Sequence, residues 1–164
     1  MPAIRARPLP PDSLLARHSR AGDHTDCYAC EVPGAVPLAA LVEAFYCSRG
    51  FLPERLLLYL IGRGASPADA RRLARGESEV FAAWRVEARM AEELLLQDFQ
   101  ERTRSWLAVE PLGEGGTRLC FGSGVAWRGR GDAPFKALMG FHAAYSRVLL
   151  RAAAAGIGRA SARR

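Results

Sequence analysis

The chain has 164 residues, of which 49% are hydrophobic and 24% are charged, and its formal net charge is +6. These fractions are typical of a globular domain and exclude a wholly disordered chain, a collagen-like chain and a coiled coil. The length suits one domain with its own hydrophobic core.

The positive charge lies at the two ends of the chain. Residues 1–20 carry four arginines and one aspartate, and residues 151–164 carry four arginines and no acid. Residues 21–150 therefore hold 15 of the 23 basic residues and 16 of the 17 acidic ones, a net charge of −1. A nucleic-acid-binding domain needs its cations on the folded surface, where they meet phosphates. We therefore expect no nucleic-acid partner.

The ends also differ from the middle in composition, since they are rich in Pro, Ala and Gly. We predict an irregular N-terminal lead-in over residues 1–22, a single domain over 23–155 and a disordered basic tail over 156–164. Prolines interrupt the N-terminal stretch where a signal peptide needs an apolar run. The longest strongly apolar run, Leu56–Ile61, is far shorter than the ~20 residues that span a bilayer. We expect a soluble cytoplasmic protein with no membrane partner.

Apolar periodicity predicts the elements in chain order. They are a strand (25–32), three helices (38–45, 53–61 and 67–73), four strands (81–88, 92–97, 102–110 and 117–127) and a long helix (133–155). Short strands joined by tight turns indicate an antiparallel meander. The predicted fold class is α+β, with a curved antiparallel sheet of about five strands against a long C-terminal helix.

Four cysteines occur, and two of them follow two histidines in a zinc-like spacing: His18, His24, Cys27 and Cys30. Residues 25–32 are predicted to form a strand, however, and residues three apart in a strand face opposite sides. We therefore interpret Cys27 and Cys30 as small apolar residues rather than as a zinc or redox site. The sequence predicts neither a metal nor a cofactor.

On one face of the strand 117–127, Arg118 is followed by four small residues in succession: Cys120, Gly122, Gly124 and Ala126. These cannot fill the space between a curved sheet and a long helix. Two alternatives follow, namely that the helix packs unusually close to the sheet there, or that the space holds a ligand.

The order of elements resembles the START-like, or helix-grip, superfamily, which includes polyketide cyclases and lipid-carrier domains. The local sequence is similar to a bacterial domain family of unknown function within that superfamily. The similar segments are Thr25–Tyr28, Glu93–Asp98, Arg102–Leu107 and Phe141–Arg147. The resemblance implies a sheet that grips the C-terminal helix, with a cavity between them. It transfers no catalytic residue.

His142 is the leading candidate for catalysis. It stands with Met139 and Tyr145 on the apolar stripe of the last helix, and its pKa range suits a general base. Tyr145 would be its partner or line a pocket. The alternative is a core histidine that is hydrogen-bonded to a neighbour.

Arginines on one strand are the candidates for binding an anion. Arg102 and Arg104 share a face with Trp106 and could clamp a carboxylate or a phosphate, unless that face is solvated and paired across strands. The predicted ligand-binding residues are Tyr59, Arg102, Arg104, Trp106, Cys120, Gly122, Gly124 and Met139.

Three functional hypotheses follow. The leading one is a binding module that holds a small apolar molecule between the sheet and the C-terminal helix. The second is a cyclase- or isomerase-type enzyme that uses His142 as general base. The third is an interaction module, monomeric or homodimeric, in which exposed tryptophans such as Trp84, Trp106 or Trp127 meet a partner.

Overall fold

A computed structural model describes residues 2–48, 64–113, 115–126 and 132–161; within the last range, side chains are described from residue 144 to 160. The strands are β1 (Arg5–Ala6), β2 (His24–Pro33), β3 (Val80–Phe81), β4 (Trp84–Arg89), β5 (Glu93–Asp98), β6 (Thr103–Leu112) and β7 (Gly116–Val125). The helices are α1 (Ala16–Arg20), α2 (Leu38–Tyr46), α4 (Pro67–Ala74) and α5 (Asp132–Ser161).

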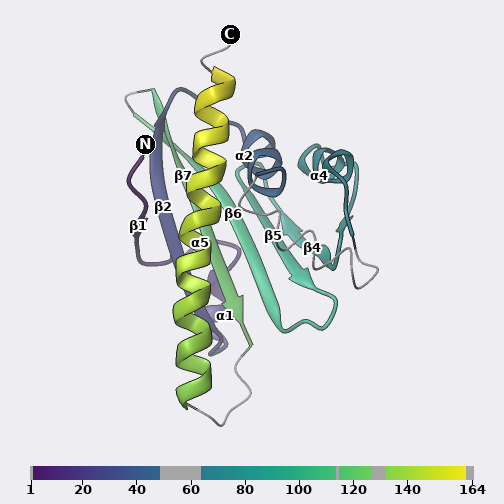
Figure 1. Ribbon diagram of the computed structural model, residues 1–164, viewed down its shortest axis with the longest axis vertical. Coiled ribbons are helices and arrows are strands. Elements are labelled where there is room, and N and C mark those ends of the chain that lie inside the picture. Colours follow the sequence, from purple (N-terminus) through teal and green to yellow (C-terminus); the bar gives the residue numbers. More distant parts are fainter. Residues whose placement is uncertain (1, 49–63, 114, 127–131, 162–164) are drawn as a thin grey trace.

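The strands form one antiparallel sheet in the order β1-β2-β7-β6-β5-β4-β3. The long α5 lies alongside β2 and β7, as Figure 1 shows. The fold is therefore α+β, with an open antiparallel sheet and a C-terminal helix, as the sequence predicts. The predicted number of strands is wrong, because the described residues form seven strands rather than about five.

The two additional strands have separate causes. Phe81 pairs with Trp84, so the chain turns through Ala82, whose φ of 54° is unusual for a residue other than glycine, and the predicted strand 81–88 becomes β3 and β4. An alanine gives no turn signal in the sequence. The other addition is β1, which pairs with β2 as a short edge strand.

Helices α2 and α4 begin where the sequence predicts. Pro37 precedes α2, whose buried side chains Leu41, Val42 and Phe45 follow helical spacing. Ser66 and Asp69 form a capping box at the start of α4. The predicted helix 53–61, which includes Tyr59, lies outside the described residues.

The sheet has two covered faces. We call the face toward α2, α4 and α5 the inner face; its apolar core includes Tyr28, Phe121, Leu107 and Leu94, which are cross-strand neighbours. We call the opposite face the outer face. Residues 2–22 are called the N-terminal segment. The part of this segment that contains Leu9, Leu14 and Leu15 covers the outer face, and Leu15 belongs to one buried cluster with Trp106 and Cys120.

Both predicted ends differ from the structure. The N-terminal segment is not an irregular lead-in, because it contributes β1 and α1, and its Leu15 is fully buried. The tail predicted to be disordered from residue 156 is helical as far as Ser161 in α5. Ile157 is buried in the inner core, which explains why the helix continues.

A membrane-spanning helix is not among the described elements, since none combines the length and apolar character that a bilayer requires.

Candidate functional site

Five predicted ligand-binding residues lie together on the outer face of β6 and β7. Arg104 is opposite Gly124, Trp106 is opposite Gly122, and Cys120 is opposite Ala108. Strand alternation therefore predicts correctly that these residues share one face. Their predicted position between the sheet and the C-terminal helix is wrong, because α5 covers the other face.

The small side chains of this face make room for the N-terminal segment. A Cβ on Gly122 would lie 2.7 Å from the backbone oxygen of Asp26, 2.9 Å from Cε3 of Trp106 and 3.1 Å from Cδ2 of Leu15. A Cβ on Gly124 would lie 3.1 Å from Cδ1 of Leu15. Close packing thus explains why glycine occupies these two positions. The group that packs against them is the side chain of Leu15, not the long C-terminal helix.

An ion cluster fixes the N-terminal segment beside Arg104. His18 Nε2 lies 2.9 Å from Glu87 Oε1, and His18 Nδ1 lies 3.5 Å from Asp23 Oδ2. Arg104 reaches the same two carboxylates, with Nε 3.3 Å from Glu87 and Nη1 3.5 Å from Asp23. Arg104 is therefore a structural ion-pair partner, and its side chain is only 11% exposed.

Glu87 gives the outer face a pH-dependent stability. Burial opposes ionisation of Glu87, but the hydrogen bond from His18 and the charges of His18, Arg17 and Arg104 outweigh it and lower its pKa below 4.5. A carboxylate with a lowered pKa stabilises the fold above its unfolded-state pKa, and this contribution is lost as the pH falls through the folded-state value.

We expect Glu87→Gln to lower the free energy of unfolding by about 2 kcal/mol at pH 7, with the difference from the unmodified protein shrinking below about pH 4.5. Urea unfolding at several pH values measures this difference. Glu77→Gln is the control, since Glu77 is exposed and lies 3.9 Å from Arg75, so its effect should stay within about 0.5 kcal/mol. A difference for Glu87→Gln that does not change with pH would contradict the assignment.

The cysteines behave as buried apolar residues. Cys27 belongs to the outer core and Cys30 to the inner core, so the two face opposite sides of β2 as predicted. Burial raises the pKa of Cys27 to about 12 and that of Cys30 to about 11, values that disfavour the reactive thiolate. Within the described ranges, no group of three metal-ligating side chains occurs.

A row of polar side chains crosses the inner face, which is otherwise apolar. Asp26 on β2, Ser123 on β7 and Ser105 on β6 are direct cross-strand partners. Tyr46, at the end of α2, places its hydroxyl 3.2 Å from Oγ of Ser105. We call these four residues the polar row. The serines and the tyrosine are buried.

Asp26 is the charged member of the polar row. Its Oδ1 accepts hydrogen bonds from the backbone N–H of Ser123 at 2.9 Å and from the Ser123 hydroxyl at 2.7 Å. Its Oδ2 accepts no hydrogen bond from the described part of the chain. A half-buried carboxylate with an unused oxygen can accept a hydrogen bond from a bound molecule.

The helix α5 lies over the next row of the inner face. The Arg147 guanidinium stacks 5.1 Å from the ring centre of Tyr28, two residues after Asp26 on β2. Tyr145 is partly buried against the inner core. Met139 and His142 belong to α5, but their side chains lie outside the described part.

The other predicted residues have different places. Arg102 is exposed just before β6. Trp106 is buried, so it cannot meet a partner; Trp84 is partly buried, and Trp127 lies outside the described residues. The sequence analysis missed the polar row, although the alternation that joins Tyr28 to Cys30 also places Asp26 on the inner face.

A hollow lies between α2 and the C-terminal part of α5. It has a volume of about 1000 Å³ and is lined by small residues such as Ala44, Ala152 and Gly156. A Cβ on Gly156 would lie 3.8 Å from Cβ of Ala44, so the two helices approach closely.

The comparisons with known proteins identify no relative. No family model, no curated protein and no solved structure matches the chain.

Proposed function

We propose that the protein is a binding module for a small, mainly apolar molecule, held on the inner face of the sheet with a polar group of the molecule at the polar row. The unused Oδ2 of Asp26 is the observation that supports this most. Asp26 is half-buried and Oδ2 is not among the fully buried atoms that lack a partner, so a bound molecule can reach it. A bound hydroxyl or amine would satisfy Oδ2.

The chemistry of the inner face suggests the kind of molecule. Two residues along β2 and β7 from Asp26 and Ser123, the aromatic side chains of Tyr28 and Phe121 form the next cross-strand pair. These rings favour an apolar ligand. Ser105 and Tyr46 add hydroxyl groups that both donate and accept hydrogen bonds. The expected ligand therefore has an apolar skeleton and at least one hydrogen-bond donor.

The resemblance to the helix-grip superfamily supports the same location. In that arrangement, a ligand lies between the sheet and the C-terminal helix, and here α5 covers the inner face, where the polar row lies. Membership of the superfamily is part of the proposal.

Native mass spectrometry of the protein purified from its own source tests the proposal. We expect a non-covalently bound small molecule, and we expect Asp26→Asn to lower its occupancy at least about tenfold, because a hydrogen bond to a charged group is lost. Asp12→Asn is the matched control, since Asp12 is exposed on the N-terminal segment and the substitution removes the same charge.

Two results would contradict the proposal. One is a protein that carries no small molecule under gentle ionisation. The other is an Asp26→Asn protein that keeps full occupancy, because Asp26 would then serve only the strand pairing with Ser123. Thermal unfolding of each variant shows whether the fold is retained.

The enzyme hypothesis stays a prediction that rests on the sequence. It requires His142 as general base with Tyr145 near a bound substrate, and it predicts that His142→Ala abolishes turnover while leaving the fold intact. The large exposed apolar residues on the described surface are Val80, Met90, Phe99 and Val148. Val80 lies in β3 and Val148 in α5, whereas Met90 and Phe99 follow β4 and β5, so they do not share one helix or strand face that would favour an interaction module.

A further inference from the structure

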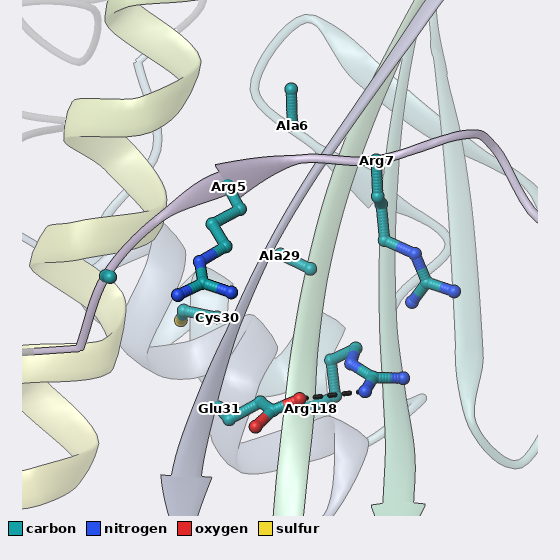
Figure 2. A pocket seen from close by; sticks show the side chains of 8 residues that line it. Arg5, Ala6, Arg7, Ala29, Cys30, Glu31 and Arg118 are labelled. Atoms are coloured by element: carbon teal, nitrogen blue, oxygen red, sulfur yellow. Dashed lines mark hydrogen bonds and ion pairs between the residues drawn. The ribbon is translucent and has the colours of Figure 1, made fainter.

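A hollow of about 480 Å³ opens at the β1 edge of the sheet, away from the polar row. Its lining includes Ala29 and three arginines, Arg5, Arg7 and Arg118. Figure 2 shows Arg5 on β1 and Arg7 just after it, on either side of Ala29, with Arg118 beneath them, joined to Glu31. The small Ala29, directly opposite Arg5 in the pairing of β1 with β2, leaves the space between the guanidinium groups open.

The arginines of this hollow have more donors than local acceptors. Arg7 uses only Nη1, which reaches both oxygens of Glu110 at 2.8 and 2.9 Å. Arg118 uses Nη1 for Glu110 and Nη2 for Glu31. Nε and Nη2 of Arg7 and Nε of Arg118 thus make no hydrogen bond to described residues. Since a guanidinium has five N–H donors, several remain unused.

The side chain of Arg5 makes no hydrogen bond or ion pair to the described part of the chain, and it is exposed. Two carboxylates face the hollow and its border. Glu31 forms an ion pair with Arg118, and Glu110 forms ion pairs with Arg7 and Arg118. Three positive charges therefore stand against two negative ones, and the excess charge is that of Arg5. The side chains of the hollow and its border therefore carry a net charge of +1.

We propose that this hollow binds a phosphate group, with Arg5 as the main ligand and the unused N–H donors of Arg7 and Arg118 completing the site. Several guanidinium groups around one space suit a tetrahedral oxyanion, which offers acceptors in several directions and up to two charges. A carboxylate is planar and singly charged, so it uses fewer of these donors. Inorganic phosphate and a phosphate monoester share this chemistry. The site is independent of the proposed ligand site on the inner face.

Calorimetric titration of the full chain with inorganic phosphate, methyl phosphate and acetate tests the proposal, at constant ionic strength set with chloride. We expect both phosphates to bind and acetate to bind at least about tenfold more weakly. Arg5→Gln should weaken the binding of phosphate about tenfold, because it removes the charged donor with no other partner. Arg151→Gln is the matched control, since Arg151 is exposed on α5 and the same charge is lost.

The outcomes separate clearly. The site is supported if both phosphates bind and the binding weakens in Arg5→Gln but persists in Arg151→Gln. If inorganic phosphate binds and methyl phosphate does not, the site is also supported, and the free ion is identified as the ligand. Three results overturn it: no binding of either phosphate, acetate binding as tight as phosphate, or equal weakening in the two variants. Because the side chain of Arg5 makes no hydrogen bond or ion pair to described residues and the substitution leaves the backbone pairing with β2 in place, Arg5→Gln should unfold at the same temperature as the unmodified protein.

Discussion

Gly122→Ala is expected to lower the free energy of unfolding by about 3 kcal/mol, at the upper end of what overpacking costs. The added Cβ would stand 2.7 Å from the backbone oxygen of Asp26 and 2.9 Å from the Trp106 ring. Neither neighbour can yield easily, because the first is backbone paired within the sheet and the second is a fully buried ring. Urea unfolding followed by tryptophan fluorescence measures the loss.

Two other glycines provide a graded control. At Gly124 the closest atom to an added Cβ is the tip of Leu15, at 3.1 Å, which can move, so Gly124→Ala should cost about 1 kcal/mol. At Gly158, in α5, nothing lies within 4 Å, so Gly158→Ala should stabilise the helix by up to about 1 kcal/mol. Equal effects at Gly122 and Gly158 would show that the outer face is not closely packed.

Leu15→Ala is expected to cost about 3 to 4 kcal/mol, within the range for emptying a closed core site. Leu15 is fully buried between α1 and the glycines of β7, although it lies in a segment rich in proline and arginine. Its loss leaves a cavity over Gly122 and Trp106. Chemical unfolding measures the effect, and near-ultraviolet circular dichroism should report a looser Trp106.

Leu14→Ala is the matched control for Leu15→Ala. Leu14 is partly buried, and its main anchor, the 2.8 Å bond from its backbone N–H to Glu93, survives the substitution. The loss should therefore stay near 1 kcal/mol. If Leu15→Ala were no more destabilising than Leu14→Ala, the N-terminal segment would not close the outer face.

Much of the sheet follows from local patterns in the sequence. Strand alternation groups Arg104 with Trp106 on one strand and Cys120 with Gly122 on the next, and it separates Cys27 from Cys30. Ser66 and Asp69 mark the start of α4 because a capping box is a local interaction. These features depend on a few neighbouring residues, which the sequence shows directly.

Such patterns do not show which segment of the chain packs against each face of the sheet. Both faces of β7 could meet a helix, and the sequence does not state that Leu15, about a hundred positions earlier, inserts against Gly122. The turn at Ala82 lacks a glycine or asparagine signal. The polar row was missed for the same reason, because Asp26, Ser123 and Ser105 become neighbours only through the strand register.

The N-terminal positive charge also has a structural use. Arg7 pairs with Glu110, Arg17 pairs with Glu87, and His18 lies between Glu87 and Asp23. Much of the excess at this end of the chain therefore matches carboxylates on the sheet. Arg20 donates instead to the backbone oxygen of Pro11, and the side chain of Arg5 has no partner in the described part of the chain, which is why Arg5 carries the proposed phosphate site.

Determining the structure of the protein with its co-purified molecule bound tests the central claim most directly. We predict that the molecule lies on the inner face, with a hydroxyl or amine within hydrogen-bond distance of Asp26 Oδ2 and its apolar part toward Tyr28 and Phe121. A molecule found instead in the hollow between α2 and α5, or on the outer face beside Leu15, would contradict the claim.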